Sequence, residues 1–132
     1  FLKEVPDIPK FRSCTANKYP VGEGLGLHND GKAWLPFVMG ITLNSARHME
    51  FFDPTTKERL IIETPRLSAY LFFSNVYDTW YHSSMKGSKS GKYYQYATAY
   101  SLTYRTCNES YTGDTYESRI NDSIYNSAKS IQ

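Results

Sequence analysis

Residues 24–30, GLGLHND, carry the pattern that most constrains this protein. Leu25 and Leu27 alternate with glycine, and the run ends in His28, Asn29 and Asp30. Apolar residues repeating with a period of two predict a β-strand that stops at the polar end of the run. Side chains two residues apart in a strand point to the same face. His28 and Asp30 are therefore predicted to share a face, as two ligands of one metal ion require.

Short strand-like runs separated by turn residues continue along most of the chain. Their spacing is typical of an all-β sandwich or barrel of about eight strands, with neighbouring runs resembling hairpins. Twelve tyrosines and many β-branched residues also favour strands, and no amphipathic helix is expected before Thr115. The expected strands are RSCTANKY (12–19), GLGLHND (24–30), FVMGITL (37–43), RHMEFFD (47–53), ERLIIE (58–63), LSAYLFF (67–73), DTWYHSS (78–84) and the run from Tyr93 to Arg105.

The length and composition predict one domain with a C-terminal tail. The chain has 132 residues, which is the usual size of one domain, and we expect the domain to span residues 1–107 and the tail residues 108–132. In the tail, Ile120, Ile124 and Ile131 lie at roughly helical spacing, so a short helix and a disordered segment both remain open. No apolar run approaches the roughly 20 residues that a membrane span needs.

Charge and cysteine content point to an ordinary intracellular protein. The net charge of +2 is too small to indicate nucleic-acid binding by itself. The lysines of the 85–92 loop are best explained as a solvated loop. Cys14 and Cys107 are too few for a disulfide framework and lack the paired spacing of a zinc site. We therefore expect a reducing setting, in the cytoplasm or the nucleus.

A second histidine would complete a metal site around His28 and Asp30. Two histidines and one carboxylate form the facial triad that suits non-haem Fe(II) and leaves coordination positions open. The residues alone leave two candidates for the third ligand, His48 and His82. Arg105 is the expected anchor for an anionic ligand beside such a metal, because guanidinium groups bind carboxylates well.

Several motifs together resemble the AlkB-like branch of the Fe(II)/2-oxoglutarate-dependent dioxygenases. NKYPVGEGLGLHND (17–30) is similar to the family pattern in which Asn-x-Tyr precedes the His-x-Asp strand. PFVMGITLNSARHMEF (36–51) resembles the segment with an arginine and a phenylalanine-containing strand. TPRLSAYLFFSNVYDTWYH (64–82) resembles the segment leading to the distal histidine, and AYSLTYRT (99–106) the closing strand. The resemblance covers roughly residues 14–106, with the motifs in family order.

The resemblance implies a fold and a set of site residues. The implied fold is mainly β, a double-stranded β-helix (a jelly-roll, cupin-like barrel) of about eight strands followed by the short C-terminal tail or helix. His28, Asp30 and His82 would be the catalytic residues and bind Fe(II), whereas His48 has no counterpart in the family and is expected to be a structural strand residue. The cosubstrate 2-oxoglutarate would be bound by Asn17, Tyr19 and Arg105.

The implied activity is an oxidoreductase that uses O2 and 2-oxoglutarate to hydroxylate or oxidatively demethylate a substrate. A nucleic-acid base is the favoured substrate, although a protein or small-molecule substrate and the oligomeric state are left open. Trp34, Tyr77, Trp80 and Tyr81 are candidates for aromatic walls around a flipped base. A place in the core is the stronger expectation for these aromatic side chains.

One departure from the family pattern concerns the closing strand. The family carries two arginines there, and the first of them falls on Ala99. Arg66, Arg47, or Tyr19 with other hydroxyl groups are candidate replacements in binding the distal carboxylate of 2-oxoglutarate. The alternative is a catalytically impaired barrel that binds nucleic acid or protein. A cupin-like metal protein without 2-oxoglutarate is a third hypothesis, and it would not need Asn17, Tyr19 or Arg105.

Overall fold

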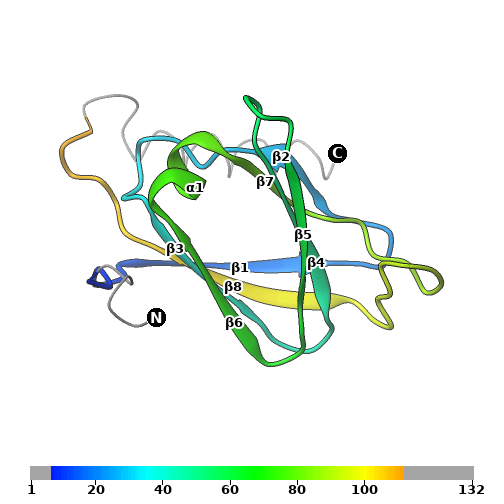
Figure 1. Ribbon diagram of the computed structural model, residues 1–132. Coiled ribbons are helices and arrows are strands. Elements are labelled where there is room, and N and C mark those ends of the chain that lie inside the picture. The colour runs from blue at the N-terminus through cyan, green and yellow to red at the C-terminus, as the bar shows by residue number, and fades with distance from the viewer. Residues whose placement is uncertain (1–6, 112–132) are drawn as a thin grey trace, which may run out of the picture.

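A computed structural model describes residues 7–111, which form eight strands and one short helix (Figure 1). Turns with Pro, Gly, Asn or Asp separate most of the strands. The elements are β1 (Ser13–Tyr19), β2 (Leu25–His28), β3 (Phe37–Thr42), β4 (Arg47–Phe52), β5 (Arg59–Thr64), β6 (Ser68–Phe73), α1 (Ser74–Thr79), β7 (Tyr81–Ser84) and β8 (Ala99–Arg105).

The strands form two four-stranded antiparallel sheets that face each other (Figure 1). One sheet has the order β1-β8-β3-β6 and the other β2-β7-β4-β5. The chain passes from one sheet to the other between all consecutive strands except β4 and β5. This is the arrangement of a double-stranded β-helix, or jelly roll, and it confirms the expected mainly β, cupin-like barrel of eight strands.

The expectation of neighbouring hairpins was wrong for most of the fold. Of the consecutive strands within residues 7–111, only β4 and β5 pair with each other. The turn at Asn44 and Ser45 was predicted to close a hairpin, but it carries the chain from β3 to β4 in the opposite sheet. Short connections of this kind look the same in sequence whether the next strand pairs with the previous one or faces it.

Two element boundaries also differ from the sequence prediction. The helix α1 was not expected; it turns the chain between the sheets and buries Tyr77. The last strand was expected from Tyr93, but it begins at Ala99. Before that point, the Gln95 side chain donates hydrogen bonds to the carbonyl oxygens of Tyr19 and Ala97, both at 2.8 Å. The Gln95 side chain thus occupies carbonyl oxygens that the backbone N–H groups of a longer strand would otherwise bind.

The space between the sheets divides into an apolar and a polar part. The apolar core consists of Val38, Met49, Phe51, Phe72 and Tyr77, with several partly buried aromatic residues against it. The polar part contains buried polar side chains. Such side chains are uncommon in a protein core, so their grouping here indicates a functional site. These buried polar residues include Thr42, Arg47, Thr64, His82, Ser84 and Gln95.

Most of the predicted tail, including Ile120, Ile124 and Ile131, lies outside the described residues. Within residues 7–111, no helix is long and apolar enough to cross a membrane.

Candidate functional site

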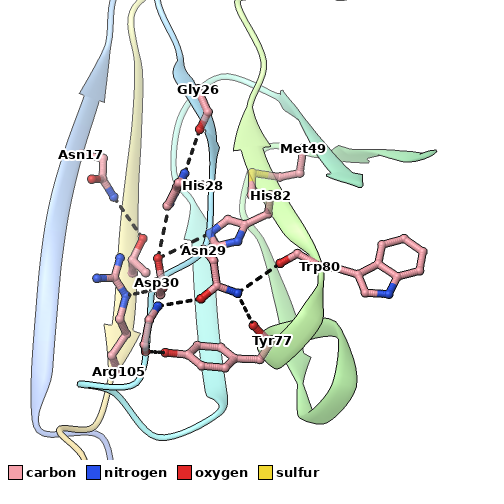
Figure 2. A network of polar contacts seen from close by, with 12 residues as sticks. Asn17, Gly26, His28, Asn29, Asp30, Met49, Tyr77, Trp80, His82 and Arg105 are labelled. Carbon is pink, nitrogen blue, oxygen red and sulfur yellow. Dashed lines mark hydrogen bonds and ion pairs between the residues drawn. The ribbon is translucent and has the colours of Figure 1, made fainter. Parts of the chain in front are cut away.

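The structure brings His28, Asp30 and His82 together between the two sheets (Figure 2). His28 ends β2, and His82 is its partner in the antiparallel ladder on β7. Asp30 Oδ1 lies 3.3 Å from His28 Nε2 and 3.6 Å from His82 Nε2. One potential ligand atom from each residue lies within 4.8 Å of the others. The predicted pair of His28 and Asp30 is close in space, but β2 ends at His28 and Asp30 lies in the turn that follows it. The β2–β7 ladder places His82 beside both.

The turn after β2 holds Asp30 in place through Asn29. The Asn29 amide donates to the carbonyl oxygens of Tyr77 (2.8 Å) and Trp80 (3.3 Å), and its oxygen accepts from the Gly31 amide (2.8 Å). The Tyr77 hydroxyl donates to the Gly31 carbonyl at 2.7 Å. The helix α1 thus anchors the turn that presents Asp30 (Figure 2). The sequence analysis did not assign this positioning role to Asn29, although its place between two predicted ligands could have indicated it.

Both imidazole rings are oriented by their surroundings. His28 Nδ1 lies 2.8 Å from the Gly26 carbonyl oxygen, so that Nε2 faces Asp30. A backbone partner at one ring nitrogen fixes which nitrogen is offered to a metal. His82 is buried, and its ring lies 4.8 Å from that of Phe72. Neither ring can turn away without losing these contacts.

The charges at the site keep Asp30 ionised. Burial by itself would raise the pKa of Asp30, but the hydrogen bond from His28 and the positive charge of Arg105 hold that pKa below its ordinary value. Arg105 Nε lies 3.1 Å from Asp30 Oδ2. The hydrogen bond to Asp30 raises the pKa of His28, whereas burial lowers the pKa of His82 to about 4. A carboxylate and a neutral imidazole are the protonation states that bind metals.

The three side chains fit a divalent metal ion. Two imidazoles and one carboxylate form a donor set typical of non-haem Fe(II) sites. Asp30 Oδ2 is buried and ion-paired with Arg105, but it makes no hydrogen bond among the described residues, so it can still accept a further ligand. His48 is not part of the cluster. It packs instead edge-on against the Tyr93 ring at 5.1 Å, as expected for a structural strand residue.

A cavity of about 50 Å³ adjoins the three residues between the sheets. All six predicted site residues line it, because Asn17 and Tyr19 on β1 and Arg105 on β8 face the same interior as His28, Asp30 and His82. Asn17 donates to Thr103 Oγ1 at 3.1 Å and to Ser101 Oγ at 3.4 Å. Hydroxyl groups and one further cation, Arg47, complete the polar lining.

Arg47 and Arg66, the two cations proposed to replace an arginine at position 99, differ in burial and in their position relative to the cavity. Arg47 on β4 is 4% exposed and lines the cavity. Arg66 is exposed in the turn between β5 and β6 and does not line it. Of these two cations only Arg47 adjoins the cavity, and Tyr19, the other candidate replacement, lines it as well.

The four candidate aromatic walls do not line this cavity. Tyr77 belongs to the apolar core, and Trp34 and Trp80 pack against it, which confirms the core expectation for these three residues. The guanidinium of Arg105 also lies over the Trp34 ring, 5.3 Å from its centroid. Tyr81 is 41% exposed on β7.

No family model and no curated protein matches this chain. Two solved structures share its fold: Drosophila melanogaster CENP-C bound to CAL1, and the CENP-C cumin domain of the same organism. Each gives a TM-score of 0.51 at 4% sequence identity over 70% of this chain. The match covers 64% and 57% of those chains, so this chain spans less than two thirds of their length. At this identity the likeness concerns the fold alone.

Proposed function

We propose that this protein is an Fe(II)- and 2-oxoglutarate-dependent dioxygenase of AlkB-like type, which hydroxylates or oxidatively demethylates its substrate. The observation that carries the proposal is the convergence of His28, Asp30 and His82 on one cavity that also contains Arg105. The arrangement supports an enzyme because a buried carboxylate between two imidazoles and a cation needs a ligand to become fully partnered.

In this proposal His28, Asp30 and His82 hold the metal, which together with 2-oxoglutarate supplies oxygen activation and oxidation of a C–H bond. Arg105 has two tasks. It keeps Asp30 ionised, and its positive charge attracts the carboxylate of an acid that enters the cavity. Val38, Met49 and Phe72 line the apolar side of the cavity and exclude water from it. Asn17, held by two hydroxyl groups, adds a fixed amide to the wall.

The proposed primary substrate approaches from the solvent side of His28. The His28 side chain is 31% exposed, whereas that of His82 is 10% exposed. A cavity of about 50 Å³ is too small to enclose a nucleotide, since one water alone requires on the order of 10–15 Å³. The oxidised group of a larger molecule therefore reaches the metal from outside. A methylated nucleic-acid base is the substrate class we propose to test first.

A second candidate function is a non-catalytic barrel that binds a protein or nucleic acid. Two observations favour it. Two solved structures that share the fold are CENP-C domains, one of them bound to CAL1, so a barrel with this fold can bind a protein. In addition, Ala99 stands where the AlkB-like pattern has an arginine. In this case the cluster around Asp30 would be structural.

Anaerobic spectroscopy separates the two functions. Protein purified without oxygen is mixed with Fe(II) and 2-oxoglutarate, and the metal-to-ligand absorption band and succinate release after adding air are recorded. The dioxygenase proposal expects both signals in the wild type and in His48→Ala, and neither in His82→Ala. Iron binding with neither signal in the wild type would contradict the enzyme and leave the binding barrel.

A further inference from the structure

The sheet β1-β8-β3-β6 has an apolar outer face, on the side away from the cavity. Asn17, Thr42 and Thr103 line the cavity, and side chains alternate along a strand, so the neighbours of these residues point outward. The ladder registers place the outward residues side by side across the four strands. They include Cys14 and Ala16 on β1, Leu102 and Tyr104 on β8, and Met39 and Ile41 on β3. Lys18 is the only charged residue among the outward residues of these strands.

The other sheet, β2-β7-β4-β5, shows the ordinary pattern. Its outward residues include Glu50 on β4 and Arg59 and Glu63 on β5, and Glu50 forms an ion pair with Arg59. An antiparallel sheet that meets water on one face carries polar side chains there. The apolar outer face of β1-β8-β3-β6 is therefore not that of a sheet in contact with water.

The chain before β1 covers part of this apolar face and leaves a groove beside it. The Phe11 ring lies 6.0 Å from the Phe37 ring and 5.8 Å from the Tyr104 ring. The groove is lined by Cys14, Met39, Ile41 and Tyr104, together with Phe11 and Arg12. Cys14 is exposed there. Large exposed apolar patches are uncommon on monomeric proteins and mark contact surfaces.

The described chain ends at the border of this groove. Glu109 forms an ion pair with Arg12, which lines the groove. Residues 112–132 follow the last described residue. Extended, residues 110–114 would span up to about 17 Å, at roughly 3.3–3.6 Å per residue. The segment that follows them can therefore reach the groove without any rearrangement of the barrel.

The sequence of this segment contains the pattern of an amphipathic helix. Asp114 is followed three residues later by Glu117, which is typical of a helix N-terminus. Apolar residues then recur every three or four positions and fall on one side of a helix. They are Tyr116, Ile120, Ile124, Ala128 and Ile131. The charged residues Arg119, Asp122 and Lys129 fall on the other side.

Such a helix matches the groove in size. Residues 115–131 would form a helix about 25 Å long, at roughly 1.5 Å per residue, and about 10 Å wide. Strands of six or seven residues are about 20–23 Å long, and four of them side by side are about 19 Å wide. One helix lying along the strands would therefore cover β8 and β3, where the groove lies.

A second copy of the chain is a poorer occupant of this face. Four strands of this length present about 400 Å² of sheet. A stable interface between two proteins buries about 800 Å² on each partner. A segment of the same chain needs less contact area, because its attachment gives it a high effective concentration at the groove.

We infer that residues 115–131 dock as an amphipathic helix on the groove formed by Cys14, Met39, Ile41 and Tyr104. Ile120 and Ile124 are the central contacts, and the charged side of the helix faces water. The inference does not depend on the dioxygenase proposal, because the groove and the metal cluster lie on opposite sides of the sheet.

The thiol of Cys14 tests whether the groove is covered. In the full chain with Cys107→Ser, Cys14 is the only thiol, and its reaction with 5,5′-dithiobis(2-nitrobenzoate) is followed by absorption. We expect a slow reaction that does not depend on protein concentration. Adding Ile120→Asp/Ile124→Asp should accelerate it about 10-fold or more, because each buried isoleucine contributes about 1.5–3 kcal/mol. The control Ser118→Asp/Asn126→Asp adds the same charge on the polar side and should leave the rate unchanged.

Thermal unfolding gives a second measurement on the same proteins. Ile120→Asp/Ile124→Asp should unfold several degrees below the control, because isoleucines that lie in water in the folded protein would not affect its stability. Circular dichroism shows whether each variant is folded. If Ile120→Asp/Ile124→Asp does not fold, the single variant Ile124→Ser decides, and it should accelerate the thiol reaction several-fold.

Two results would overturn the inference. One is a Cys14 that reacts equally fast in the parent, in the control and in the variant that decides. The other is a reaction that slows as the protein concentration rises, with a dimer in sedimentation and equal rates in the apolar-side and polar-side variants. That second result would assign the groove to another copy of the chain.

Discussion

The rings of His28 and His82 lie 4.3 Å apart, on directly opposed residues of the β2–β7 ladder, with the Asp30 carboxylate beside both. The β2–β7 ladder contains two residue pairs, Leu25–Ser84 and His28–His82, with a register shift between them. This short ladder thus carries two of the three proposed metal ligands. The geometry of this site depends on a short, irregular strand pair, and the turn at Asn29 compensates for that by tying β2 to α1.

Removing His82 should abolish stabilisation by metal. Mn(II) or Fe(II) at about 100 times its dissociation constant should stabilise the wild type by about 2.7 kcal/mol. His82→Ala should lose this gain, and His48→Ala should keep it because His48 packs on Tyr93 away from the cluster. Thermal unfolding with and without metal, under nitrogen, measures the difference. If metal raised the unfolding temperature of His82→Ala as much as that of the wild type, the ion would bind elsewhere.

Asn29→Ala should weaken both the fold and the metal site. The substitution removes three hydrogen bonds that join the turn to Tyr77, Trp80 and Gly31. We expect a loss of about 1–3 kcal/mol in the free energy of unfolding and a metal affinity about 10–100-fold lower. Denaturant unfolding and metal titration test the two effects. The matched control is Asn75→Ala, which changes an exposed asparagine on α1. A wild-type metal affinity in Asn29→Ala would contradict the anchoring role of Asn29.

Arg105→Gln should separate binding of the metal from binding of 2-oxoglutarate. The guanidinium compensates Asp30 at 3.1 Å and lines the cavity, but it is not a proposed ligand. We expect 2-oxoglutarate affinity to fall about 10–100-fold, as for the loss of a charge-assisted hydrogen bond, while Mn(II) still binds. Arg12→Gln removes an exposed arginine paired with Glu109 and should leave both affinities unchanged. Undiminished 2-oxoglutarate binding in Arg105→Gln would remove Arg105 from the cosubstrate site.

Gly40→Ala should destabilise the wall of the cavity. Gly40 on β3 is paired with Tyr70 on β6, and a Cβ atom at residue 40 would overlap the Tyr70 ring. Overpacking of this kind costs about 1–3 kcal/mol. Gly26→Ala is the control, because a Cβ atom there meets nothing within 4 Å. Urea unfolding curves of the two variants should differ by that amount, and equal midpoints would show that Tyr70 moves aside freely.

The period-two pattern was sufficient to place most strands. It also predicted that His28 and Asp30 lie close together, but the structure achieves this with a turn after β2 that Asn29 holds in place. It could not show which strands pair, because the short links at Asn44 and at Pro65 are compatible with a hairpin and with a change of sheet. Arg47 was one of several candidate replacements for an arginine at position 99, and the sequence could not choose among them. An arginine in a strand is ordinarily solvated, and only the position of β4 opposite β1 shows that this one faces Tyr19.

The choice between His48 and His82 also needed more than local sequence. Each lies in a strand-like run, His48 after Arg47 and His82 after Tyr81, and the resemblance to a family favoured His82. The ladder explains this choice physically: His82 opposes His28, while His48 alternates with the inward-facing Arg47 and Met49 and so lies on the other face of its strand.

The pairing of β1 with β8, in which Ser13 opposes Arg105, gives the cavity a wall made from two ends of the described chain. A growing polypeptide therefore has no complete pocket until residue 105 has left the ribosome. Loop closure over such a separation is slow, and jelly-roll folds rich in these pairings reach the native state in milliseconds to seconds. Asn17 and Tyr19 lack their β8 partners until that strand has been made, so ligand binding would report that β1 and β8 have paired.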